Sequence, residues 1–200
     1  EHHSNQLPWL ESVADVVEIG LTPEGGIDLQ DLSRKLEANA ARPLKIGAFS
    51  AASNVTGVLT DVKAVARALH AHGAYACFDY AAAAPYVKLD VNQTDDDGLL
   101  IHHDAIFLSP HKFIGGPGTP GVLVAKKHLF TNDVPTVPGG GTVMYVNPKE
   151  HRYVANIEHR EEGGTPAIIE SIGAGLVFQL KEAVGQETIR AKEEDYIRRA

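Results

Sequence analysis

A lysine follows a short apolar segment near the middle of the chain. Residues 105–108 read AIFL, which predicts a strand covered on both faces, and Pro110 then ends its hydrogen-bonding ladder. Lys112 stands just beyond that proline. Ligands bind at the carboxyl ends of strands in open α/β sheets, so Lys112 either faces a pocket there or is an ordinary surface lysine.

An aspartate ends a second apolar segment in the same way. Asp79 follows the strand-like sequence YACF, and a carboxylate at the end of a buried strand is costly without a partner. Asp79 has two possible roles. The structural one is a helix cap or a salt bridge, and the functional one is a carboxylate that binds a cationic ligand. Lysine and acid together suggest pyridoxal phosphate, which forms a Schiff base with a lysine and needs an acid beside its ring nitrogen.

The bulk composition predicts one ordinary globular unit. The chain has 200 residues, of which 44% are hydrophobic and 22% charged, and its net charge is −8. Because there is no basic surface and no apolar run as long as a membrane span, we expect neither nucleic acid nor membrane as a partner. The single cysteine, Cys77, excludes an internal disulfide and favours a reducing compartment. We expect the cytoplasm, with an organelle as the alternative because the first residue is not methionine.

Strand-like and helical patterns alternate along the sequence. This alternation predicts an α/β fold, a three-layer αβα sandwich with a mostly parallel sheet and helices on both faces. Asp28 and Thr60 are the expected N-caps of the first two helices, and residues 92–103 are expected to form a solvated excursion. The expected strands lie in residues 13–19, 43–50, 74–86, 104–109 and 121–127. The expected helices are residues 26–39, 60–73, 167–184 and a charged segment that runs to residue 200.

Three further features of the sequence are not interpreted as functional sites. Residues 116–121, GPGTPG, match G-x-G-x-x-G, but a strand pattern follows where a dinucleotide-binding site needs a helix. Cys77 shares a strand with an acidic neighbour, so we expect a packed core thiol instead of a nucleophile. The histidines lack any metal-ligand spacing, so no metal site is predicted. Four of them are expected to face solvent: His70, His72, His102 and His103.

Five segments, taken in order, resemble one enzyme family, the class V aminotransferases. That pyridoxal-phosphate-dependent group includes cysteine desulfurases and selenocysteine lyases. The resemblance runs from residue 1 to about residue 181 and implies the large domain of fold type I. It is carried by EHHSNQLPW, SNVTG, FDYAAAAPY, SPHKF and REEGGTP.

The resemblance also implies roles for individual side chains at the sheet edge. Lys112 of the S-x-H-K segment is similar to the lysine that forms the Schiff base with pyridoxal 5'-phosphate. Ser109 and His111 resemble residues that reach the cofactor phosphate. Asp79 matches the acid that pairs with the pyridine nitrogen and so keeps the ring an electron sink.

Three more roles follow from segments further from the lysine. His2 resembles a histidine that stacks on the pyridine ring and takes part in proton transfer. Asn54 resembles an asparagine near the cofactor's phenolic oxygen and the substrate carboxylate. Thr165 resembles a threonine that reaches the phosphate of the neighbouring subunit, which implies that the parent enzyme is a homodimer.

The sequence also departs from the family. Many relatives carry a glutamine where this chain has Ala82, so Asn54 is expected to hold the phenolic oxygen without that partner. The family's first phosphate-binding loop and its C-terminal small domain have no counterpart here. Residues 1–200 are therefore expected to be a partial cofactor-binding large domain. On its own this fragment is expected to bind cofactor poorly and to be inactive.

These observations predict a pyridoxal-phosphate-dependent enzyme that acts on a small amino acid through a Lys112 Schiff base. Desulfurase, lyase and aminotransferase activities all remain open. The alternative is a non-catalytic scaffold or binding module that keeps the fold, and the presence of Ala82 favours it. Retention of both Asp79 and Lys112 favours the enzyme.

Overall fold

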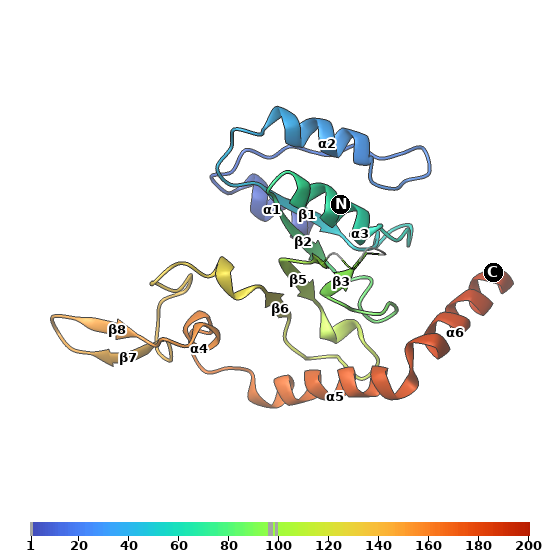
Figure 1. The fold of residues 1–200 in the computed structure, drawn as a ribbon. Coiled ribbons are helices and arrows are strands. Elements are labelled where there is room, and N and C mark those ends of the chain that lie inside the picture. Colours follow the sequence, from blue (N-terminus) through green and yellow to red (C-terminus); the bar gives the residue numbers. More distant parts are fainter. Residues whose placement is uncertain (1, 96–97, 99) are drawn as a thin grey trace.

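The computed structural model describes residues 2–95, 98 and 100–200 (Figure 1). Its helices are α1 (His3–Leu10), α2 (Leu29–Ala38), α3 (Val62–Ala71), α4 (Ile157–Glu161), α5 (Ile168–Val184) and α6 (Gln186–Arg199), with 3-10 turns η1 (Pro110–Lys112) and η2 (Lys127–Leu129). Its strands are β1 (Ile46–Ser50), β2 (Tyr75–Asp79), β3 (Asn92–Thr94), β4 (Leu100–His102), β5 (Ala105–Leu108), β6 (Val122–Ala125), β7 (Val143–Val146) and β8 (His151–Tyr153).

The central sheet is mostly parallel, as predicted. Its strand order is β1-β2-β5-β6, in which β1, β2 and β5 are parallel and β6 pairs with β5 in the antiparallel sense. At the carboxyl ends of the parallel strands, Ser50 pairs with Asp79 and Asp79 pairs with Phe107. Three strands therefore end side by side at one edge.

Helices pack against this sheet, in agreement with the predicted α/β fold. Helix α3 packs on β2, α2 packs on α3, and α5 runs past β6 and contacts η1 (Figure 1). The apolar stripe of α3 is buried through Val65 and Leu69, and Phe78 of β2 is completely buried beneath it. Val177 of α5 joins the same core. Burial of these apolar surfaces is the main stabilising contribution.

Helix caps explain where α2 and α3 begin. The Asp28 carboxylate accepts hydrogen bonds from the backbone N–H groups of Gln30 and Asp31, as predicted. The predicted cap at Thr60 is wrong by one residue, because Asp61 caps α3 by accepting from Ala64 N. The Thr60 hydroxyl instead donates to the Ser50 carbonyl at 2.7 Å and ties the loop to the end of β1.

Two expected segments differ from the structure. Residues 13–19 are not a strand, because none of the described strands pairs with them, and Val13, Val16 and Val17 are exposed. Within residues 92–103, strands β3 and β4 pair in the antiparallel sense, and Ile101 is buried. Residues 96, 97 and 99 of that segment lie outside the described part of the chain. Apolar character alone does not make a strand, since a ladder also needs a partner.

The glycine-rich loop after η1 passes very close to the backbone that it follows. A Cβ atom on Gly116 would lie 2.0 Å from the Pro110 carbonyl oxygen, and Gly115 has φ of +82°. Only glycine permits both conditions. The loop can therefore fold back against η1, which carries Lys112, and enter β6.

None of the helices formed by the described residues is long and apolar enough to cross a membrane.

We expect the substitution Gly116→Ala to lower the free energy of unfolding by about 1–3 kcal/mol, because the added methyl group has no space. Urea unfolding measures this change. Gly139→Ala is the matched control, since its Cβ would meet nothing within 4 Å, and we expect a change within about 0.5 kcal/mol. Equal stabilities of the two variants would contradict the close approach.

Candidate active site

A cavity of about 640 Å³ opens at the carboxyl ends of β1, β2 and β5. The paired residues Ser50, Asp79 and Phe107 line it together, because the parallel register brings these three strand ends side by side. The volume lies within the range of about 300–1,000 Å³ typical of small-molecule sites. The sheet edge at which the sequence predicts a ligand therefore carries a cavity.

Six of the seven residues proposed from the sequence line this cavity. They are His2, Asn54, Asp79, Ser109, His111 and Lys112. The seventh, Thr165, is exposed and lies just before α5, and it does not contribute to this cavity. The structure thus brings Asp79 and Lys112 onto one cavity, while the expected contact of Thr165 with a neighbouring subunit stays a prediction.

Asp79 is held in place by the backbone around it. Its carbonyl accepts from Ala51 N at 2.8 Å, which continues the pairing of β1 with β2 beyond the strand. Its carboxylate Oδ1 accepts from Ala81 N at 2.8 Å. The carboxylate is half-buried and is fixed at the sheet edge by a turn that begins directly after it.

Lys112 is positioned by buried neighbours on either side of it. Pro110 and Phe113 are both buried, and Phe113 packs edge-on against Phe178 of α5 with ring centroids 5.1 Å apart. The turn is closed by Lys112 N, which donates to the Ser109 carbonyl at 3.0 Å. Because the flanking residues are anchored, His111 and Lys112 project from η1 as exposed side chains into the open cavity.

Helix α1 forms one wall of the cavity. His2 caps this helix, and its Nδ1 accepts from Ser4 N at 3.1 Å. Asn5, Pro8 and Trp9 also line the cavity, and sequence reasoning missed them. Their i, i+3, i+4 spacing places them on one helix face, which is the signal that would have found them.

The segment after Asp79 contributes small side chains. Ala82, at the position where many relatives carry glutamine, lines the cavity with a methyl group. The segment is tied to α5 by Lys181, whose Nζ donates to the carbonyls of Ala84 and Val87 at 2.6 and 2.5 Å. Burial lowers the pKa of Lys181.

Cys77 is a buried thiol, as predicted. It is 8% exposed, and burial, assisted by the charge of Asp104, raises its pKa to about 11. A thiol with so high a pKa is almost entirely protonated at neutral pH and is a poor nucleophile. Cys77 belongs to the sheet and does not line the cavity.

The prediction for the histidines needs correction. His103 is buried, with 2% of its surface exposed, and its ring lies 4.5 Å from that of Phe78. His70 and His102 are half-buried and contact Asp104. Local spacing could not show this cluster, because its members come from separate elements.

The GPGTPG segment leads into strand β6, as predicted.

Comparison with known proteins places the chain in a family. The aminotransferase class-V family model matches residues 1–200. A probable cysteine desulfurase of Streptomyces coelicolor is 29% identical over 197 residues, which cover 96% of this chain and 44% of that protein. A probable cysteine desulfurase of Halalkalibacterium halodurans is 31% identical over 199 residues, which cover 98% of this chain and 46% of that protein.

Solved structures agree with this placement. The apo structure of a cysteine desulfurase from Thermococcus onnurineus has a TM-score of 0.82 and 28% identity, covering all of this chain and 48% of that one. Cysteine desulfurase CsdA of Escherichia coli has a TM-score of 0.74 and 27% identity, covering 95% of this chain and 45% of that one. The chain belongs to the class V aminotransferase family, and it spans about half the length of the relatives that it matches.

Pyridoxal 5'-phosphate is the cofactor of this family, and the cavity residues fit it. The amine of Lys112 and the carboxylate of Asp79 are the two groups that its chemistry requires. Ser109 and His111 add a hydroxyl and an imidazole that can donate to a phosphate. This donor set and the cavity volume are compatible with the cofactor.

We expect no reaction of the folded chain with a thiol reagent such as DTNB at pH 8, because the Cys77 thiol is buried and its pKa is about 11. Denaturant should release one equivalent, since Cys77 is the only cysteine. Rapid labelling of the native chain at the rate of a small free thiol would contradict the assignment of Cys77 to the core.

Proposed function

We propose that this chain forms the cofactor-binding part of a pyridoxal-phosphate-dependent enzyme that acts on a small amino acid. The observation that carries the proposal is that Lys112 and Asp79, from different strand ends, line one cavity. Membership of the class V aminotransferase family supports the cofactor assignment. Because the chain spans about half the length of its relatives, the remaining part of the active site is assigned to segments beyond these residues.

Lys112 and Asp79 have complementary roles in this proposal. When bound, the cofactor supplies an electron sink for a carbanion at the α-carbon of an amino acid. Lys112 would hold the cofactor covalently, and its amine, when free, would move the α-proton as base and then acid. Asp79 holds a proton on the ring nitrogen, because a carboxylate favours the cationic form of a nearby base.

The other cavity residues orient and anchor the cofactor in this proposal. Ser109 and His111 donate hydrogen bonds to the phosphate, and such bonds to a charged group are stronger than neutral ones. His2 would lie against the ring; its Nδ1 accepts from Ser4 N, which leaves Nε2 as its free nitrogen. Asn54 binds the phenolic oxygen, and Ala82 cannot assist because it has no polar atom.

We also propose that the complete enzyme is a homodimer in which Thr165 reaches the partner's phosphate. Thr165 is exposed and stands three residues before Ile168, the first residue of α5. Several large apolar side chains of α5 are exposed in the single chain, and together they form an apolar surface of the kind that a partner covers. They are Ile168, Ile169, Ile172, Leu176, Leu180 and Val184.

The type of reaction stays open among desulfuration, elimination and transamination. Both relatives described above are named probable cysteine desulfurases, which makes cysteine the first substrate to test. A desulfurase needs a reactive thiolate, and Cys77 is buried away from the cavity with a raised pKa. The proposal therefore assigns no sulfur-accepting role to Cys77.

We expect borohydride reduction in the presence of pyridoxal 5'-phosphate, followed by peptide mapping, to label Lys112. Reduction traps the covalent link between the cofactor and an amine. The experiment uses the longest natural protein that contains these 200 residues, because its relatives are about twice as long. The variant Lys112→Ala should lose both the label and the visible absorption band of the bound cofactor.

Lys126→Ala serves as the control, because Lys126 does not line the cavity. It should keep both the label and the band. A label on another lysine would refute the assignment of Lys112. Failure to take up cofactor at saturating concentration would favour a non-catalytic scaffold instead.

We expect Asp79→Asn to reduce turnover at least about 100-fold, the scale of losing one electrostatic stabilising group. Cofactor attachment to Lys112 should persist, because Asp79 acts on the far end of the ring. Steady-state kinetics with the amino acid substrate measures the effect. Asp61→Asn is the matched control, since Asp61 caps α3 away from the cavity and asparagine is an equally good cap. Unchanged turnover in Asp79→Asn would remove Asp79 from the mechanism.

A further inference from the structure

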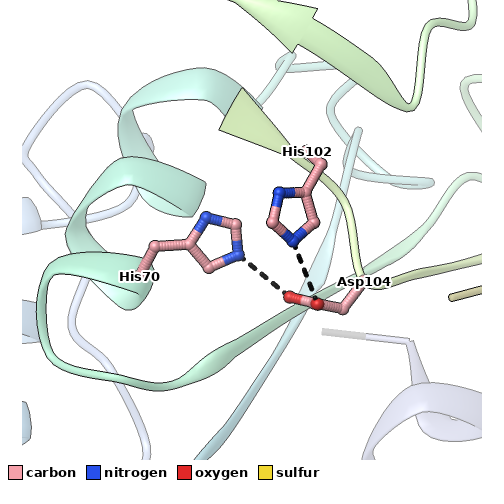
Figure 2. Close-up of side chains that lie close together, drawn as sticks. All are labelled: His70, His102 and Asp104. Carbon is pink, nitrogen blue, oxygen red and sulfur yellow. Dashed lines mark hydrogen bonds and ion pairs between the residues drawn. The ribbon is translucent and has the colours of Figure 1, made fainter. Parts of the chain in front are cut away.

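Histidines from three elements surround one buried aspartate, and Figure 2 shows two of them with it. The Nε2 atom of His70, in α3, lies 2.9 Å from Oδ2 of Asp104. The Nε2 atom of His102, in β4, lies 3.3 Å from Oδ1 of the same carboxylate. His128, in η2, places its Nε2 atom 3.9 Å from Oδ1.

This cluster lies at the opposite end of β5 from the cavity. Asp104 directly precedes β5, whereas Lys112 follows it. The strand has four residues, so its ends are separated by about 13 Å of sheet. None of the four cluster residues lines the cavity at the carboxyl ends.

The carboxylate of Asp104 is rigidly placed. It is 2% exposed, and its Oδ2 accepts from Ala76 N at 2.7 Å. The backbone of Asp104 is fixed as well, because its N–H donates to the Ala76 carbonyl and its carbonyl accepts from Lys126 N, each at 2.8 Å. Such a fixed carboxylate is a prearranged ligand, because little conformational entropy remains to be lost on binding.

The ligand atoms are close enough for one ion. One nitrogen each of His70 and His102 and an oxygen of Asp104 lie within 4.8 Å of one another. A tetrahedral zinc ion bonds imidazole nitrogen at about 2.0–2.1 Å and carboxylate oxygen at about 2.0–2.2 Å, so its ligand atoms lie about 3.3–3.5 Å apart. The rings of His70 and His102 stack with centroids 4.4 Å apart, so both already face the carboxylate from one side.

We propose that His70, His102 and Asp104 bind a divalent transition-metal ion, with His128 as the fourth ligand. The His128 side chain is 56% exposed, so it can turn toward the ion at low cost. Imidazole ligands select against magnesium and calcium, and a four-ligand site of nitrogen and oxygen atoms suits zinc. The ion would join α3, β4 and η2 to the start of β5 and would have a structural role.

The test is metal binding by the longest natural protein that contains these 200 residues, untagged and stripped with a chelator. Titration with cobalt(II) should give the intense visible absorption of a tetrahedral ion, and zinc should compete for the same site. After dialysis against zinc, elemental analysis should find one ion per chain. Cobalt that keeps the weak spectrum of the hydrated ion would overturn the proposal.

Variants locate the site. His70→Gln and His102→Gln should each bind zinc at least about tenfold more weakly. Removing a group that only hydrogen-bonds to a metal ligand already weakens binding by about tenfold, so losing a ligand should weaken it at least as much. His151→Gln, which alters an exposed histidine of β8, is the matched control and should bind like the wild type. Lys112→Ala should also keep its zinc, because the two sites are separate. Equal affinity in the wild type and both ligand variants would overturn the proposal.

A measurement of stability guards against variants that fail to fold. One equivalent of zinc should raise the unfolding temperature of the wild type, since an ion that binds only the folded state stabilises it. His128→Gln changes an exposed side chain, so this variant should fold, and it should lose most of that increase. An unfolding temperature that zinc leaves unchanged in the wild type would show that the cluster is only a hydrogen-bonded network.

Discussion

The parallel alignment of β1, β2 and β5 is the constraint on which the rest of the structure depends. It places Ser50, Asp79 and Phe107 in one row at the carboxyl edge, and the hydrogen bonds from Ala51 to Asp79 and from Tyr80 to Phe107 extend the row past the strands. A shift of one residue would turn Asp79 to the other face of the sheet. The cavity exists because three backbones end at the same level.

The two ends of the sheet have different chemistry. At the carboxyl end, exposed polar groups on turns line an open cavity, which suits a ligand that enters and leaves. At the amino end, Asp104 is buried and fixed by Ala76, and half-buried imidazoles cover it. Strand β5 joins the two, so whatever stabilises its start also supports the turn that carries Lys112.

The sequence predicted most of the elements that position the cavity, because their signals are local. Asp28 marks the start of α2, and the apolar stripe with Val65 and Leu69 marks the buried face of α3. The prediction failed where contacts with distant parts of the chain decide the structure. Residues 13–19 lack a described strand to pair with, and His103 is buried by Phe78 and Tyr80. The cluster around Asp104 could not be predicted, since its members meet only in the folded chain.

The central claim is that Asp79 and Lys112 hold opposite ends of one aromatic cofactor at the carboxyl edge of the sheet. A crystal structure of the protein with pyridoxal 5'-phosphate tests it most directly. The account predicts continuous density from Lys112 Nζ to the cofactor's aldehyde carbon, with an oxygen of Asp79 about 2.7–2.9 Å from the ring nitrogen. A ring bound outside this cavity, or one whose nitrogen points away from Asp79, would contradict it.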